Sequence, residues 1–271
     1  MNYTGIKNQV SNHKSFYRNF TISKDSDSDR ILIDEPYGLS LLFKSILLYL
    51  HSDYDLIIHN VNTWLDIKNT RRKSGLIFTI KRWLRKIILW KAKSIIVVGI
   101  PLMEKWQKHS KKNVKYYPFI PSSNITIPSK YCKDKIIIVP GSVNRLKRYD
   151  RIIKLIEKLE YDEVHFLGVV QNGCDDLVEE IIQALSEHKR HKVRFYRERI
   201  DQSDFDKMMQ RAYLVVVDFE ENIITPDGYL EVFGQSKESG TFWLAAFYRK
   251  PLAAPIMRED IPDINIKYII G

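Results

Sequence analysis

The chain has 271 residues, of which 44% are hydrophobic and 12% aromatic, and its formal net charge is +10. This composition is that of a globular protein long enough for two domains, and it excludes a disordered or low-complexity chain. The only cysteines, Cys132 and Cys174, lie in no CxxC or Cys/His cluster, which excludes a disulfide scaffold and a structural zinc site.

The positive charge is concentrated in the first half. Residues 1–130 hold 22 Lys and Arg against 9 Asp and Glu, whereas residues 131–271 hold 21 against 24. A basic half indicates nucleic acid, an anionic membrane surface or phosphorylated substrates. The first residues are too polar for a signal peptide, and no apolar run reaches the roughly 18 residues of a spanning helix. We therefore expect a cytoplasmic protein, or one peripheral on the cytoplasmic face of the cell membrane.

The first half opens with alternating elements. Residues 31–33 favour a strand, residues 39–51 a helix, and residues 55–62 a strand that becomes polar as it ends. Parallel α/β folds bind ligands at the carboxyl ends of their strands, so His59 is a candidate site residue. The alternative is a histidine with a structural role.

The most basic segment runs from Arg71 to Ser94 and holds nine Lys and Arg with no acidic residue. Its tryptophans and aliphatic residues recur at helical spacing, which predicts a basic amphipathic helix suited to anionic lipid headgroups. A nucleic-acid surface and a helix packed on the core with solvated lysines are the alternatives. The residues assigned to the membrane are Arg71, Arg72, Lys73, Lys81, Arg82, Trp83, Arg85, Lys86 and Trp90.

A polar, proline-punctuated stretch at residues 121–129 is typical of a linker. It follows a predicted strand at 94–100, a helix at 101–110 and a strand at 114–118. We therefore divide the chain into an N-terminal domain, 1–124, and a C-terminal domain, 125–271.

The second half alternates strands with helices, which predicts a parallel sheet covered by helices. The predicted strands are 135–139, 163–168, 193–196 and 213–218, and the predicted helices are 149–159, 174–188 and 203–211.

The stretch from Glu231 to Pro255 carries the densest functional pattern. Two carboxylates, Glu231 and Glu238, precede Ser239-Gly240-Thr241, which is typical of a helix start. Free N–H groups at a helix N-terminus suit a phosphate, and a carboxylate can accept two hydrogen bonds from sugar hydroxyls. The pattern predicts a pocket for a nucleotide diphosphate that carries a sugar. An ordinary α/β loop with a solvated glutamate is the alternative.

The chain contains no GxGxxG, Walker or GxSxG motif and no paired metal-ligand motif. Its second half resembles the donor domain of a two-Rossmann (GT-B) glycosyltransferase of the retaining "glycosyl transferases group 1" type. The resemblance rests on the strand, glycine and basic loop of residues 139–150, the strand ending at Gly168, the turn at 193–199 and the helix that follows the two glutamates. In the first half, residues 54–60 and 92–106 look like parts of the acceptor domain.

The resemblance implies an α/β fold of two Rossmann-like domains facing each other across a cleft (GT-B), compact or truncated at both ends. Six residues rather than the usual seven separate the two glutamates, and the final helices of the family are absent. The N-terminal domain would bind the acceptor and the C-terminal domain the nucleotide-sugar.

The resemblance also implies residue roles. Arg145 and Lys147 would neutralise the donor diphosphate, and Glu238 would hold the ribose hydroxyls. Glu231 and His59 would be the catalytic residues. The whole donor-binding set is Gly141, Arg145, Lys147, Arg148, Gly168, Arg197, Glu238, Ser239, Gly240 and Thr241.

The implied activity is transfer of a sugar from a nucleotide-diphosphate sugar to a saccharide or lipid-linked acceptor, in surface polysaccharide or glycolipid synthesis. The nucleotide-sugar would be a substrate, with no cofactor and no metal, because no Asp-x-Asp lies near the donor loops. We expect an anionic membrane surface as a partner and no nucleic acid. A catalytically inactive relative that binds nucleotide or a protein partner is the main alternative, and a nucleic-acid-binding α/β protein rests on charge alone.

Overall fold

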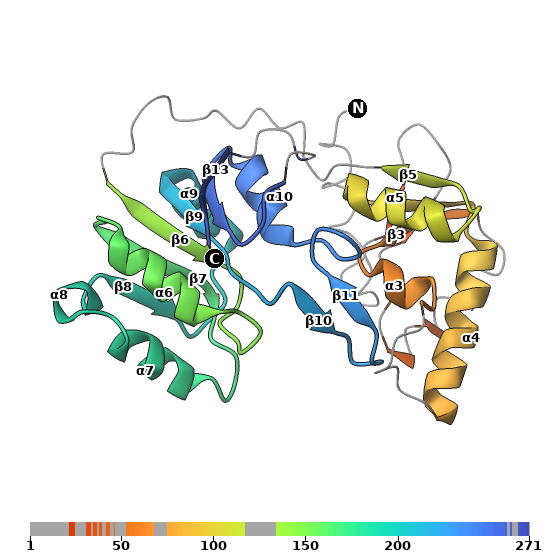
Figure 1. Ribbon diagram of the computed structural model, residues 1–271, viewed down its shortest axis with the longest axis horizontal. Helices are drawn as coiled ribbons and strands as arrows, with labels where there is room; N and C mark the ends of the chain where they lie inside the picture. Colours follow the sequence, from red (N-terminus) through yellow and green to blue (C-terminus); the bar gives the residue numbers. More distant parts are fainter. Residues whose placement is uncertain are drawn as a thin grey trace. The chain divides into compact units, whose positions relative to one another are not determined.

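A computed structural model describes residues 22–24, 31–33, 35–36, 38–39, 42–43, 46, 53–67, 75–116, 134–258, 261 and 265–270. The chain divides into two units (Figure 1). Unit 1 consists of residues 1–123 and 222–238, and unit 2 consists of residues 124–221 and 239–271. Residues 222–238, which the sequence analysis assigned to the C-terminal domain, therefore belong to the first unit.

Unit 1 is built on a five-stranded sheet of order β1-β2-β3-β4-β5. The β1–β2 pair is antiparallel, and the other neighbours are parallel. The strands are β1 (Ile22–Lys24), β2 (Ile31–Ile33), β3 (Tyr54–Ile58), β4 (Ser94–Val97) and β5 (Val114–Tyr116). The helices are α3 (Val61–Trp64), α4 (Leu76–Lys91) and α5 (Ile100–His109).

The core of unit 1 forms because β3 and β4 are almost continuously apolar. Their buried residues pack with Leu84 and Ile88 of α4 and with Leu102 and Trp106 of α5. Of the predicted helix at 39–51, the described residues 39, 42, 43 and 46 are helical, and Leu42 is fully buried.

A short antiparallel hairpin completes unit 1. It pairs β10 (Asn222–Ile224) with β11 (Leu230–Val232), and no strand was predicted here from the sequence. Residues 234–237 form a tight turn in which the N–H of Gly234 bonds to the carbonyl of Lys237 at 2.9 Å.

Unit 2 contains a six-stranded, fully parallel sheet of order β13-β12-β9-β6-β7-β8. The strands are β6 (Ile136–Pro140), β7 (Glu163–Val169), β8 (Val193–Tyr196), β9 (Ala212–Val216), β12 (Pro251–Ala254) and β13 (Asn265–Ile269). The last strand was not predicted.

Five helices of unit 2 are described. They are α6 (Tyr149–Lys158), α7 (Asp175–Gln183), α8 (Glu187–Arg190), α9 (Gln202–Arg211) and α10 (Gly240–Phe247). Helices α6 and α7 lie side by side over one face of the sheet (Figure 1), where their apolar stripes join the main core. The predicted helix at 174–188 is two helices, interrupted at residues 184–186.

Candidate functional site

The basic loop after β6 lies at the carboxyl edge of the unit 2 sheet. Gly141 has φ +84°, a conformation that favours glycine, and turns the chain out of the strand. The Nζ of Lys147 then donates to the carbonyls of Pro140 at 2.8 Å and of Gly141 at 2.9 Å. Burial lowers the pKa of Lys147 to about 8. The loop therefore holds a fixed cation at the strand end, where α/β folds bind ligands.

Three arginines around this loop are paired with carboxylates of their own unit. Arg145 bonds to Asp176, and Arg197 pairs with Asp175 at the start of α7. Arg148, which precedes α6, reaches Asp150 and Glu220 at 3.0 Å each. All of these carboxylates are more than half exposed at the side chain, so such pairs are weak in water and can be exchanged for a stronger anion. The structure thus places Arg145, Lys147 and Arg148 on one loop.

Gly168 is required by a close approach of two backbones. A Cβ on this residue would lie 2.6 Å from the carbonyl oxygen of Gly141 and 2.7 Å from the N of Ser142. The end of β7 therefore packs directly on the start of the basic loop. The resemblance named Gly168 as donor-binding, and the structure shows what the position requires sterically.

Asp218 is a candidate site residue that the sequence analysis did not single out. It follows β9 at the same sheet edge, has no exposed surface, and lies 3.7 Å from Nη1 of Arg151 in α6. Burial raises its pKa to about 6, although the charges of Arg151 and Arg148 oppose the shift. The sequence did hold a signal for Asp218, namely a carboxylate directly after an apolar strand. In a parallel α/β fold such a position lies at the edge of the sheet where ligands bind.

The predicted start of α10 is confirmed. Ser239 is the N-cap, and its hydroxyl accepts a hydrogen bond from the N–H of Thr241 at 3.4 Å. Gly240 is exposed, and a Cβ there would meet no atom within 4 Å. Glu238, directly before the cap, is 7% exposed. The N-terminus of α10 is therefore open at Gly240, next to a buried carboxylate in sequence.

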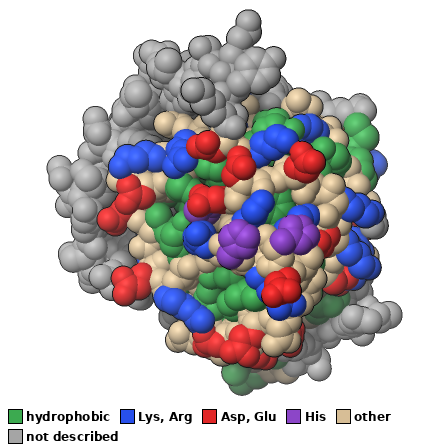
Figure 2. Space-filling view, turned by 90° about the vertical axis from the view of Figure 1, so that its left-hand side faces the viewer, with side chains coloured by type: hydrophobic (Ala, Val, Ile, Leu, Met, Phe, Trp, Pro, Cys, Tyr) green, Lys and Arg blue, Asp and Glu red, His purple; other side chains and the backbone are tan. Residues whose placement is uncertain are grey.

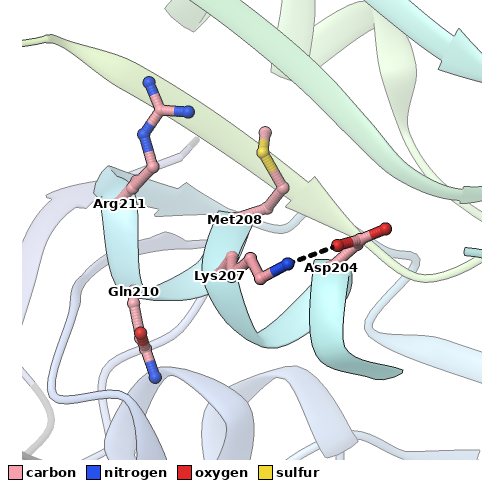
Figure 3. A pocket seen from close by; sticks show the side chains of 5 residues that line it. All are labelled: Asp204, Lys207, Met208, Gln210 and Arg211. Atoms are coloured by element: carbon pink, nitrogen blue, oxygen red, sulfur yellow. Dashed lines mark hydrogen bonds and ion pairs between the residues drawn. The ribbon is translucent and has the colours of Figure 1, made fainter. Parts of the chain in front are cut away.

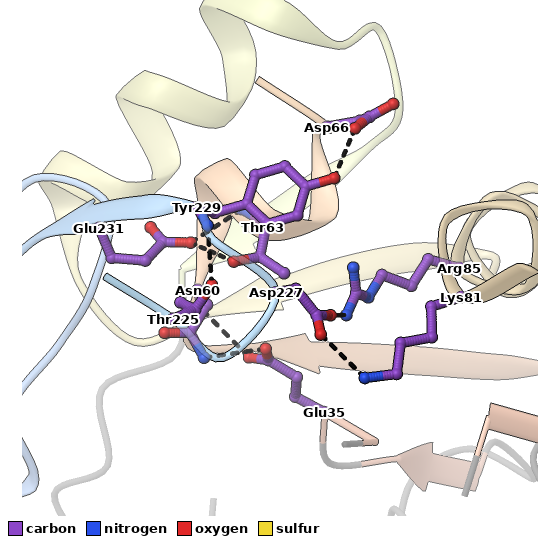
Figure 4. A network of polar contacts seen from close by, with 10 residues as sticks. All are labelled: Glu35, Asn60, Thr63, Asp66, Lys81, Arg85, Thr225, Asp227, Tyr229 and Glu231. Carbon is purple, nitrogen blue, oxygen red and sulfur yellow. Dashed lines mark hydrogen bonds and ion pairs between the residues drawn. The ribbon is translucent and has the colours of Figure 1, made fainter. Parts of the chain in front are cut away.

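Glu231 lies inside unit 1 and has no exposed surface. Its Oε1 accepts from the N–H of Thr63 at 2.8 Å and from the Thr63 hydroxyl at 2.7 Å (Figure 4). Its Oε2 accepts from the N–H of Asn62 at 3.3 Å. Burial raises its pKa. The carboxylate thus binds free N–H groups at the start of α3. The sequence led us to expect that Glu231 contacts a donor sugar, but neither of its carboxylate oxygens is exposed.

The other end of the hairpin is held by buried charge. Asp227 bonds to Arg85 and, at 2.8 Å, to Nζ of Lys81, while the Tyr229 hydroxyl bonds to Asp66 at 2.6 Å (Figure 4). Arg85 is buried. The sequence analysis assigned Lys81 and Arg85 to the membrane surface. In the structure both instead form ion pairs with Asp227 of the hairpin, which is far away in the sequence.

The remaining face of α4 is unusually apolar for a surface. Trp83 is 60% exposed and Trp90 is 79% exposed, and Leu76 and Ile77 are exposed as well. The buried residues of the helix are Leu84, Arg85 and Ile88, so the tryptophans are not core residues. Arg82 is half-buried and bonds to Thr79, and Lys86 is exposed. Arg71, Arg72 and Lys73 lie outside the described residues.

His59 stands at the carboxyl end of β3, as predicted. Its backbone N–H donates to Oε2 of Glu35 at 2.6 Å, and its side chain is half-buried. Glu35 was not singled out from the sequence, although it follows the predicted strand at 31–33 at the same sheet edge.

Two cavities of unit 2 are lined by none of the predicted site residues. One, of about 410 Å³, is lined by Asp204, Lys207, Met208, Gln210 and Arg211 of α9 (Figure 3). The other, of about 650 Å³, lies where α6 ends, and Lys189 there donates to the carbonyls of Ile156, Glu157 and Leu159. Acidic and basic side chains alternate over the face shown in Figure 2, so its described residues form no continuous basic patch.

Within the described ranges, no group of three or more His, Cys, Asp or Glu side chains is arranged to hold a metal ion. Among the helices that the structure describes, none is both long and apolar enough to cross a bilayer.

No protein-family profile and no curated protein sequence matches the chain. Similar solved structures include Anabaena Alr3699/HepE in complex with UDP, at 14% identity and TM-score 0.50, with 82% of this chain and 59% of that chain covered. Sucrose-phosphate synthase from Thermosynechococcus elongatus has 16% identity and TM-score 0.49, over 82% and 55%. The Gap123 glycosylation-associated protein complex from Streptococcus agalactiae has 14% identity and TM-score 0.48, over 90% and 46%.

The chain therefore spans about half the length of the solved proteins that it resembles. The likeness to the UDP complex confirms the predicted fold class, α/β with two Rossmann-like units of the GT-B type.

Proposed function

We propose that the chain transfers a sugar from a nucleotide-diphosphate sugar to a saccharide or lipid-linked acceptor. The observation that carries this proposal is the carboxyl edge of the unit 2 sheet. There Lys147 is fixed beside Gly141, and Arg145 and Arg148 lie on the same loop. The open N-terminus of α10 belongs to the same unit. The fold shared with a UDP complex agrees with a nucleoside diphosphate as ligand.

The proposed chemistry follows from charge. As the bond between the sugar and the diphosphate breaks, the sugar becomes oxocarbenium-like and the diphosphate gains negative charge. A fixed ammonium and backbone N–H groups stabilise that charge most when they need no rearrangement, and losing one such donor typically costs about 3–4 kcal/mol of barrier. If the diphosphate replaced Asp176 as the partner of Arg145, and Asp150 and Glu220 as the partners of Arg148, both arginines would be available for the same task.

The finer parts of the proposal concern mechanism and cellular setting. We propose the retaining, metal-independent reaction of the "group 1" type, with Lys147 and Arg145 in place of a divalent cation. We propose surface polysaccharide or glycolipid synthesis as the process, at the inner face of the cell membrane. The exposed tryptophans of α4 support a membrane-bound acceptor, because tryptophan side chains favour the lipid headgroup region.

Nucleotide binding is the first test. A thermal-shift panel of UDP, GDP and ADP should show one ligand that raises the melting temperature, because a ligand of the folded state stabilises it. Glu238→Ala should abolish or strongly weaken that shift while the protein stays folded, since this carboxylate is assigned to the ribose. No shift with any nucleotide would contradict the proposal.

Turnover is the second test. Release of sugar from the matching labelled donor should persist in EDTA, and Arg145→Ala and Lys147→Ala should each lower it. Loss of the reaction in EDTA, with recovery on adding a divalent ion, would contradict the metal-free mechanism. Nucleotide binding without any turnover would favour the inactive, partner-binding alternative.

A further inference from the structure

Arg151 lies one helical turn after Arg148, in the first turn of α6, and is paired differently from the arginines of the basic loop. Its Nη1 lies 3.7 Å from Oδ1 of Asp218, which is too far for a hydrogen bond. Within the described part of the chain its guanidinium donates no hydrogen bond, and its side chain is 32% exposed. Arg148, by contrast, bonds to both Asp150 and Glu220. The N–H donors of Arg151 are therefore available to a ligand.

Asp218 places this guanidinium beside the basic loop. β6 and β9 are parallel neighbours in which Ile138 is opposite Val215. Gly141 and Asp218 each lie three residues further along the chain, so they come side by side at the carboxyl edge, where adjacent strands are about 4.8 Å apart. The carbonyl of Gly141 accepts from Nζ of Lys147 at 2.9 Å. An ammonium and a guanidinium thus flank the same stretch of the edge, and both belong to unit 2.

The pairing of Arg151 with Asp218 is unfavourable for the carboxylate. Asp218 has no exposed surface, and burial raises its pKa to about 6, so its charge is costly to keep. A diphosphate carries more charge and can accept from a guanidinium at two oxygens, which is the geometry that arginine favours. Arg151 can therefore gain by exchanging Asp218 for a diphosphate. The exchange leaves the carboxylate of Asp218 buried without a cation.

We propose that Arg151 is a further residue that binds the diphosphate of the donor, and that Asp218 holds its guanidinium at the sheet edge until the ligand takes it over. The inference rests on the proposed function, in which the basic loop binds this diphosphate. It requires residues of unit 2 only. The sequence pattern did not point to Arg151, because it lies inside the helix that follows the loop.

The test is titration calorimetry at neutral pH with the nucleoside diphosphate that stabilises the wild type most among UDP, GDP and ADP. Arg151→Met should weaken binding about tenfold, through loss of a charge-assisted bidentate contact. Arg151→Lys keeps a cation without the bidentate geometry and should recover part of the loss. Asp218→Asn should bind severalfold more tightly than the wild type, because no buried carboxylate then loses its cation.

A double variant separates binding from folding. Arg151→Met alone leaves the carboxylate of Asp218 buried without a cation and can lower stability for that reason. Arg151→Met/Asp218→Asn buries no such charge. It should show the same tenfold loss relative to Asp218→Asn, at a melting temperature close to that of Asp218→Asn.

Arg211→Met is the matched control. Arg211 pairs with Asp134 at 3.1 Å, directly before β9 and just before β6, so this ion pair joins the same two strands at their amino ends. The variant removes the same charge from unit 2 at the opposite edge of the sheet and should bind like the wild type.

The possible failures are distinct. Unchanged binding in Arg151→Met, or an equal loss in Arg211→Met, would overturn the binding role of Arg151. Weaker binding in Asp218→Asn would overturn the competing role of Asp218. Wild-type protein that binds none of the three nucleotides would overturn the proposed function, and this inference with it.

Discussion

The carboxylate of Glu231 accepts hydrogen bonds from both the backbone N–H and the hydroxyl of Thr63, a residue 168 positions earlier in the chain. This contact joins the hairpin of the second half of the sequence to α3 of the first. It explains why residues 222–238 belong to unit 1, since a fully buried carboxylate must be matched by donors that lie in that unit.

Removing this carboxylate should destabilise unit 1. In Glu231→Ala the two N–H groups and the hydroxyl lose their acceptor, and each buried unpaired donor costs about 1–3 kcal/mol. Thr63→Val is the matched control, because it removes one hydrogen bond without leaving a donor unpaired and should cost about 1 kcal/mol. Urea unfolding measures both variants. Wild-type stability in Glu231→Ala, with turnover lost, would instead favour the catalytic role expected from the sequence.

The sequence predicted the helices and strands better than it predicted which of them contact one another. Regular alternation of apolar strands and amphipathic helices was enough for the parallel sheet of unit 2, and the Ser-Gly-Thr pattern located the start of α10. The hairpin was missed because its strands have three residues each and its register depends on unit 1. β13, also missed, is an edge strand whose residues alternate between exposed and half-buried rather than forming a buried run.

The direction of the α4 cations could not be predicted for a similar reason. Helical spacing identified the apolar positions, but Arg85 looks like any surface arginine until Asp227 is placed beside it. Asp218 was overlooked because a carboxylate at a strand end is common, and its burial depends on the packing of neighbouring elements. Local pattern thus located the helix start at Ser239, and the family resemblance pointed to Lys147 and Gly168, whereas long-range contact decided the surroundings of Glu231 and Arg85.

Nucleotide affinity should depend on pH through Lys147. Burial lowers its pKa to about 8, so the ammonium is charged at neutral pH and loses its proton as the pH rises through that value. A hydrogen bond from a charged donor is worth about 1.5–3 kcal/mol. Because a single group with a pKa of about 8 titrates here, affinity for the nucleoside diphosphate should fall by up to about tenfold between about pH 7 and about pH 9.

Titration calorimetry over this range measures the effect. Lys147→Arg is the control, because a guanidinium stays charged throughout and should give a nearly flat profile. A wild-type profile as flat as that of Lys147→Arg would show that the Lys147 ammonium does not contact the diphosphate.

Asp218 should lower stability at neutral pH. Its pKa rises from 3.8 to about 6 through burial, so between these values the folded chain holds a proton that the unfolded chain releases. Stability from this group is therefore fully present below about pH 4 and is lost as the pH rises through about 6. Asp218→Asn should raise stability at pH 7 by about 1–3 kcal/mol and have little effect near pH 4.

Thermal unfolding of both proteins across this pH range tests the prediction. The gap between them should widen as the pH increases. If Asp218→Asn were less stable than the wild type at neutral pH, the ion pair with Arg151 would outweigh the cost of burial.

The exposed face of α4 should bind anionic lipid. Trp83 and Trp90 would insert apolar area that is insensitive to salt, while the exposed Lys86 and Lys91 would each add about 1 kcal/mol of attraction that salt screens. Co-sedimentation with phosphatidylglycerol liposomes should therefore weaken at high salt, and weaken further in Trp83→Ala/Trp90→Ala. Since both tryptophans are largely exposed, this variant should keep the melting temperature of the wild type.

A buried pair on the same helix provides the contrast. Leu84 and Ile88 pack in the core of unit 1, so Leu84→Ala should lower the free energy of unfolding by the usual cost of a core cavity, about 2–5 kcal/mol, and the melting temperature with it. Lipid binding of the folded protein should stay unchanged. Loss of stability in the tryptophan variant would mean that the tryptophans support the fold. Failure of the wild type to sediment with anionic liposomes at low salt, together with self-association that the tryptophan variant abolishes, would assign this face to a second copy of the chain instead.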